Sequence, residues 1–123
     1  MTIPESVSSI GSYAFYWCDL REVTIPSNIK SIGPRAFEYC RDLQKATLLD
    51  GVESIDYWAF ANCKLLRDVT LPGSLTSIHA TAFAKGHKDL TLMLEHDSYA
   101  VEYAKANGVS YTYADVSNDW LND

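Results

Sequence analysis

The stretch TIPESVSSIGSYAFYWC at residues 2–18 and the stretch TIPSNIKSIGPRAFEYC at residues 24–40 are two copies of one pattern, and this pattern decides the fold. Its dipeptide Ala-Phe recurs along the chain at spacings of 22, 23 and 23 residues. A period of about 20 to 50 residues is the signature of a solenoid or a related repeat architecture. The sequence therefore predicts an array of stacked repeats, with the dipeptide at Ala14-Phe15, Ala36-Phe37, Ala59-Phe60 and Ala82-Phe83.

Each repeat begins with an extended segment of the type LxxLxL. In LRDVTLP at 66–72, the apolar residues are predicted to face the interior and the polar residues between them to face solvent. A turn, a second extended piece and then the Ala-Phe segment follow, in which Ala36, Phe37 and Cys40 have the spacing of one face of a short helical turn. A single unit of this size buries little apolar surface, so stacked units are expected to share one continuous core.

These repeats resemble a known family, the BspA-like leucine-rich repeats of bacterial surface proteins, whose units read roughly LxxVxIPxSVxxIGxxAFxxCxxL. The resemblance weakens in the fourth unit, where His79 stands for the usual Gly and Gly86 for the usual Cys. It implies an α/β solenoid, a right-handed leucine-rich repeat array of short parallel strands and short helices that is closed by a C-terminal cap of one helix and one strand. It also implies a location at the cell surface or outside the cell.

The domain organisation follows from where the repeat pattern ends. We expect four repeats in residues 1–94, the first of them incomplete, then a C-terminal cap in residues 95–114, and an acidic tail or linker in residues 115–123. In the cap, a helix is predicted to begin after Asp97 or Ser98 and to stop at Asn107-Gly108, and a final strand is predicted after it.

The composition narrows the classes of partner. The chain has 123 residues and a formal net charge of -6, so we expect no binding to nucleic acid or to anionic lipid surfaces. No apolar run approaches the roughly 20 residues that span a bilayer, and the first residues do not form a signal peptide. The sequence therefore predicts a chain without membrane insertion.

The cysteines and histidines do not have the spacing of a metal site. Cys18, Cys40 and Cys63 lie one repeat apart at equivalent positions that point inward, whereas zinc sites use closely spaced pairs such as CxxC. We expect three buried, unpaired thiols and no cofactor. The sequence also has no serine beside a base, no paired carboxylates and no glycine-rich phosphate loop, so we expect no catalytic residue and no enzyme activity.

The candidate ligand-binding residues are those that point outward from the extended segments. An interaction module for a host or bacterial protein is the leading interpretation, since the outward positions of a solenoid vary while the inward positions stay apolar. A structural spacer for another domain is one alternative. The outward residues flank a file of threonines and carry both signs of charge: Arg21, Glu22, Thr24, Gln44, Lys45, Thr47, Arg67, Asp68 and Thr70.

A second alternative is a carbohydrate-binding module that uses exposed aromatic side chains. Trp17 and Tyr39 occupy the same position in adjacent repeats, and Tyr13 and Trp58 share another position that is interrupted by Arg35. Aromatic rings in such columns stack on sugar rings or on a partner protein, although they also serve to shield the edge of an array.

The N-terminal end of the array is expected to expose apolar side chains. The first repeat starts near Ile3 without a preceding strand, so Ile3, Val7, Ile10 and Phe15 lack a neighbouring repeat. We expect further repeats of a longer protein to cover this face, and we expect the isolated chain to self-associate through it.

Overall fold

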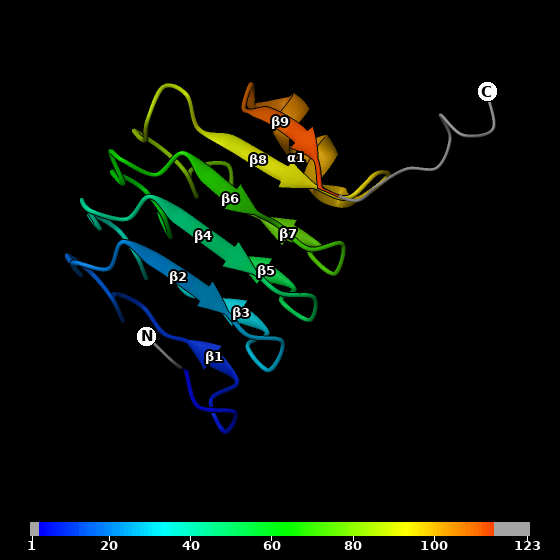
Figure 1. Ribbon diagram of the computed structural model, residues 1–123. Coiled ribbons are helices and arrows are strands. Elements are labelled where there is room, and N and C mark those ends of the chain that lie inside the picture. Colours follow the sequence, from blue (N-terminus) through cyan, green and yellow to red (C-terminus); the bar gives the residue numbers. More distant parts are fainter. Residues whose placement is uncertain (1–2, 115–123) are drawn as a thin grey trace, which may run out of the picture.

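The chain forms a parallel β-solenoid, seen in a computed structural model that describes residues 3–114 (Figure 1). Each coil contributes one strand to each of two sheets. The long sheet has five strands in the order β2 (Glu22–Ile25), β4 (Lys45–Leu48), β6 (Asp68–Thr70), β8 (Thr91–Leu94) and β9 (Ser110–Tyr113). The short sheet has four strands in the order β1 (Ser9–Ile10), β3 (Ser31–Ile32), β5 (Ser54–Ile55) and β7 (Ser77–Ile78).

All strand pairs are parallel and in the register that the repeat alignment predicts. In the long sheet, Val23 lies opposite Ala46, and Ala46 lies opposite Val69, so the inward side chains form a continuous buried row. In the short sheet, Ile10 and Ile32 pair in the same way. The solenoid expected from the sequence is therefore confirmed, and its apolar core lies between the two sheets.

The third side of each coil differs from the short helix that the spacing of Ala36, Phe37 and Cys40 predicted, because it is a run of turns. Alternate N–H groups have different partners in this run. The N–H of Ala36 closes a turn to the carbonyl of Gly33 at 3.2 Å, whereas the N–H of Phe37 crosses to the carbonyl of Ala59 in the next coil at 2.7 Å. A helix would direct every N–H along its own axis and leave the next coil unpaired. Hydrogen bonding between coils therefore replaces the helix with what we call the turn side.

The turn side requires an unusual backbone. Where a turn has its third residue at positive φ, glycine is the usual choice, but here residues with full side chains adopt this conformation. Pro34 precedes one of them, Arg35, as is common in type II turns. The conformation directs most of these side chains outward at repeating positions, namely Tyr13, Trp17, Arg35, Tyr39, Trp58 and Lys85. Asn62 has the same backbone conformation, but it is buried.

Four phenylalanine rings stack through the centre of the array. Successive centroids from Phe15 to Phe37, Phe60 and Phe83 are 5.0, 5.0 and 5.4 Å apart, and the rings are nearly parallel, with interplanar angles of 9, 2 and 8°. The stack ends against Tyr103 of the cap, whose ring meets Phe83 edge-on at 6.4 Å. Burial raises the pKa of this Tyr103 to about 12.

The predicted cap of one helix and one strand is present. Helix α1 (Tyr99–Asn107) begins after Ser98 and ends at Gly108, which adopts the left-handed conformation. The helix buries Ala100, Val101 and Ala104, as its sequence indicates, and β9 then adds to β8 in parallel, so the cap continues the long sheet (Figure 1). In the part of the chain that the structure describes, no helix has the length and apolar character to cross a membrane.

Candidate ligand-binding surfaces

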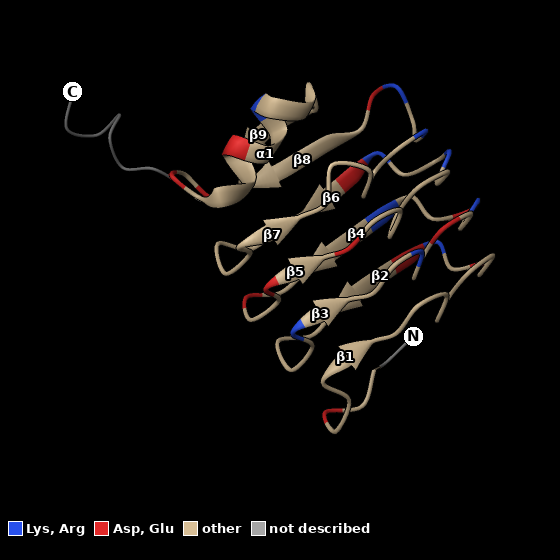
Figure 2. Ribbon diagram, turned by 180° about the vertical axis from the view of Figure 1, so that it is seen from behind, with Lys and Arg blue, Asp and Glu red and all other residues tan. Residues whose placement is uncertain are grey.

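The outward side chains of the long sheet form two rows that run across the strands, and we call this surface the strand face. In the first row, Glu22 lies opposite Lys45, and Lys45 lies opposite Asp68, so the signs of charge alternate. In the second row, Thr24, Thr47 and Thr70 follow one another in the same register. Figure 2 shows charged segments gathered where β2, β4 and β6 begin. The structure thus brings together the six strand residues that the sequence singled out.

The remaining three predicted residues flank the strand face. Arg21, Gln44 and Arg67 are exposed and come directly before the strands. Their backbones are fixed, since the N–H of Gln44 donates to the carbonyl of Arg21 at 2.8 Å and the N–H of Arg67 donates to the carbonyl of Gln44 at 3.1 Å. They add a column with two positive charges beside the row of alternating charges.

The charged row has no internal partners to hold it. Within residues 3–114, the side chains of Glu22, Lys45 and Asp68 make no hydrogen bond or ion pair with another residue. Their hydrogen-bonding capacity therefore faces water. A ligand that approaches this row replaces water and does not have to break existing ion pairs.

Sequence reasoning missed the extension of the strand face toward the cap. Thr91 and Met93 of β8 continue the two rows, and Ser110 and Thr112 of β9 end them. A shallow hollow of about 300 Å³ lies beside Thr47 and Thr70, where the strands end; its lining includes Leu48, Leu49, Leu71, Pro72, Glu95 and Ala114. The clearest signal of this hollow in the sequence is the apolar pair Leu48-Leu49. Because neighbouring side chains in an extended segment point to opposite sides, Leu49 cannot face the same core as Leu48, and it is 41% exposed.

The match to known repeats extends over most of this architecture. Residues 1–97 match the BspA type leucine rich repeat region. The chain belongs to this family. The resemblance inferred from the repeats is therefore confirmed, and the strand face of this BspA-type array is the surface built by its LxxLxL segments.

Solved structures similar to this BspA-type chain include a bacterial cell surface protein and a vaccine antigen. The pneumococcal vaccine antigen PcpA has a TM-score of 0.68 and 28% identity, over 73% of this chain and 23% of that one. A leucine-rich repeat protein from Bacteroides capillosus has a TM-score of 0.66 and 33% identity, over 72% and 64%. A leucine rich cell surface protein from Faecalibacterium prausnitzii has a TM-score of 0.56 and 25% identity, over 94% and 35%.

The BspA-type chain is shorter than each of these three proteins. It covers 23, 64 and 35% of their lengths, less than two thirds in every case. No curated protein matches it. None of the matched proteins is named as an enzyme, and a repeat region of this kind is a binding module.

The aromatic columns predicted from the sequence are present on the turn side. Trp17 and Tyr39 stack with centroids 5.2 Å apart and an interplanar angle of 18°. In the other column the Arg35 guanidinium lies between two rings, 5.9 Å from the centroid of Tyr13 and 4.8 Å from that of Trp58. The position that interrupted this column in the sequence is thus filled by a cation between two aromatic faces.

A buried carboxylate, which sequence reasoning did not predict, holds the second column in place. The side chain of Glu38 is 1% exposed, and its two oxygens accept hydrogen bonds from Nη1 of Arg35 at 3.0 and 3.1 Å. The hydrogen bond to Glu38 raises the pKa of the Arg35 guanidinium above its ordinary value. The signal in the sequence is a glutamate three positions after an arginine on the same run of turns.

The cysteines are unpaired, and two of the three are buried. Sγ of Cys40 donates to the carbonyl of Phe15, and Sγ of Cys63 donates to that of Phe37, each at 3.1 Å. Burial raises the pKa of Cys40 to about 11 and that of Cys63 to about 12, so both remain thiols. Cys18 departs from the expected burial, because it belongs to the first coil and is half-buried. Residues 3–114 contain no group of three or more His, Cys, Asp or Glu that could hold a metal ion.

Proposed function

We propose that this chain is a protein-interaction module of a larger bacterial surface or secreted protein, and that it binds a host or bacterial protein on the strand face. The observation that carries the proposal is the row of Glu22, Lys45 and Asp68, which is in register, exposed and, within residues 3–114, without ion pairs. The name of the similar Faecalibacterium prausnitzii structure, a leucine rich cell surface protein, supports the location. The proposed role requires no catalysis.

The size of the strand face limits how such a ligand binds. Five strands about 4.8 Å apart, with about four residues each at about 3.3 Å, make an area of about 300 Å². A standard interface buries about 800 Å² on each partner. A protein ligand must therefore also cover the column of Arg21, Gln44 and Arg67 and the hollow beside Thr47 and Thr70.

Reversal of one charge in the row tests the proposal. Lys45→Glu places three carboxylates side by side, and we expect it to weaken binding by about tenfold or more, since a like charge opposes the complementary partner. Lys30→Glu is the matched control, because Lys30 is exposed, undergoes the same charge change and lies directly before β3 of the short sheet. Surface plasmon resonance of both variants against a fractionated bacterial envelope and against serum proteins gives the comparison.

The same experiment separates the module from a structural spacer. Retention that falls for Lys45→Glu and stays unchanged for Lys30→Glu supports the strand face. Equal loss for both variants, or no retention of any fraction by the unchanged chain, favours the spacer and rejects this proposal.

We also expect the chain to pair with a second copy through its N-terminal end. A hollow of about 340 Å³ opens there, lined mainly by apolar residues that include Ile3, Val7, Ile10 and Phe15, and β1 and β2 are the free edges of their sheets. Helix α1 covers the opposite end of the stack. We therefore expect two copies to meet through their N-terminal ends.

Light scattering across a concentration series measures this association. We expect the average mass to rise above the 13.8 kDa of one chain, and a variant with Ile3→Asp and Val7→Asp to remain at that mass. Leu49→Asp with Leu65→Asp is the control, since it adds the same charge at exposed leucines away from the end. A mass that does not change with concentration for the unchanged chain would contradict the expectation.

A further inference from the structure

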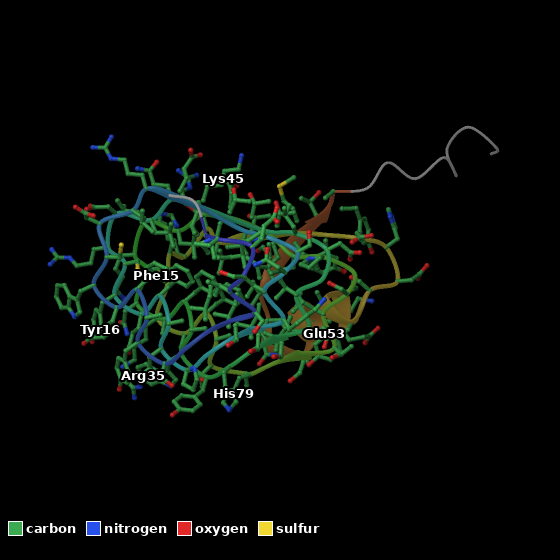
Figure 3. All side chains as sticks on the ribbon, turned by 90° about the horizontal axis from the view of Figure 1, so that it is seen from below. Phe15, Tyr16, Arg35, Lys45, Glu53 and His79 are labelled. Atoms are coloured by element: carbon green, nitrogen blue, oxygen red, sulfur yellow. The ribbon has the colours of Figure 1, made fainter. Side chains whose placement is uncertain are left out.

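We infer a second binding site on the turn side, where a hollow beside Trp17 is suited to one neutral sugar ring. The hollow has a volume of about 210 Å³, which suits a single pyranose rather than an enclosed oligosaccharide; it is lined by Trp17, Cys18, Asp19, Tyr39, Arg41 and Asp42. In Figure 3, Tyr16 and Arg35 of the turn side lie at a different margin of the array from Lys45 of the strand face. The site therefore does not depend on the proposed function.

A difference in loop length creates the hollow. Two residues separate Cys40 from Leu43, whereas only Asp19 separates Cys18 from Leu20. The first coil is thus one residue shorter at this point, and its loop does not cover the loop of the second coil. The third coil keeps the longer spacing, with two residues between Cys63 and Leu66, so this difference in loop length occurs between the first and second coils.

Trp17 provides a wall that is fixed before any ligand arrives. Its ring is 52% exposed, although Tyr39 stacks on it at 5.2 Å and the Arg41 guanidinium lies 5.5 Å from its centroid. The N–H of Trp17 donates to the carbonyl of Glu38 at 3.1 Å, so the backbone that directs the ring outward is held by the next coil. An ordered aromatic ring binds the apolar face of a sugar with little loss of conformational entropy.

The polar groups around the wall match the hydroxyl groups of a neutral sugar. Asp19, Asp42 and Arg41 are exposed, and within residues 3–114 none of them makes a side-chain hydrogen bond or ion pair. Carboxylates accept hydrogen bonds from hydroxyl groups, and the guanidinium donates to them. Two carboxylates outnumber the one guanidinium in a chain with a net charge of -6, so an anionic sugar is repelled.

The other aromatic column lacks these properties and serves as the internal control. Trp58, like Trp17, has cations over its ring, with Arg35 at 4.8 Å and Lys85 at 5.7 Å from the centroid, but it does not line the hollow. Tyr57 is 42% exposed and also lies outside the hollow. A general affinity of sugars for exposed aromatic rings would therefore affect these residues as well as Trp17.

The test is a titration of the full chain observed through the indole N–H signals in NMR spectra. The probes are the methyl glycosides of glucose, galactose and N-acetylglucosamine, with the methyl glycoside of sialic acid as the anionic comparison. We expect the Trp17 signal to move with at least one neutral glycoside, with a Kd of about 1 mM for so small a ligand. The neutral glycoside should also slow the reaction of Cys18 with a thiol reagent.

Three variants decide the outcome. Binding should weaken at least tenfold in Trp17→Ala. It should weaken by at least as much in the double variant that combines Asp19→Asn with Asp42→Asn, and it should stay unchanged in Tyr57→Ala. The double asparagine variant keeps the ring contacts and the volume, so it decides the matter if Trp17→Ala does not fold. An unmoved Trp17 signal, an equal shift of the Trp58 signal, or a response to the sialic acid glycoside alone would overturn the inference.

Discussion

Phe37→Ala is expected to lower the free energy of unfolding by about 3 to 5 kcal/mol, through lost burial and the cavity that remains. Phe37 is fully buried and has a parallel ring on each side at 5.0 Å, so its removal interrupts the stack at two contacts. Domains of this size have a total stability of about 5 to 15 kcal/mol, so the change removes a large share of it. Urea denaturation followed by circular dichroism measures the loss.

Tyr57→Ala is the control for this measurement, because its ring is 42% exposed and surface substitutions cost about 0.5 kcal/mol or less. A loss below about 1 kcal/mol for Phe37→Ala would show that this ring does not face the core. The repeat register given by the Ala-Phe dipeptide would then be wrong.

Thiol labelling at pH 8 is expected to distinguish Cys18 from the two buried cysteines by a factor of about one hundred or more. An ordinary thiol with a pKa of about 8.5 is about one quarter thiolate at this pH, and a thiol with a pKa of about 11, such as Cys40, is only about one thousandth thiolate. Cys63, with a pKa of about 12, is slower still. Cys18 is half-buried at the end of the array and should react first.

Mass spectrometry of peptides after a timed reaction with iodoacetamide gives the three rates, and urea should make them equal. Similar rates without urea, or a mass that shows an internal disulfide, would contradict the expectation. The raised pKa values also imply a pH dependence. The contribution of the two buried thiols to the free energy of unfolding is fully present below the unfolded-state pKa of about 8.5. It is lost as the pH rises through their folded-state pKa values.

The sequence predicted those parts of the fold that depend on periodic burial. The strand register, the phenylalanine stack and the helix stop at Gly108 follow from residues whose side chains or backbone permit few alternatives. The candidate residues of the strand face came from the same periodicity, and the structure places them in two rows. That they bind a ligand stays a prediction.

The parts that sequence reasoning missed depend on contacts between coils. The spacing of Ala36, Phe37 and Cys40 fits a helix and a run of turns equally well, and only the acceptor in the next coil selects the turns. Burial of Glu38 depends on where the Arg35 guanidinium lies. The hollow beside Trp17 arises from the difference between two loops, which no single repeat contains.

On the turn side, the role of each N–H group depends on whether its position in the run is odd or even. Between Gly11 and Cys18 the N–H groups of Phe15 and Trp17 cross to the second coil, and those of Ala14 and Tyr16 close turns. One inserted residue would exchange these two roles for every later position in the run. Two inserted residues would restore the roles but would displace the rings from their columns. Variation in length must therefore fall outside the run, and in this chain it falls next to Asp19, where it shapes the surface without changing the core.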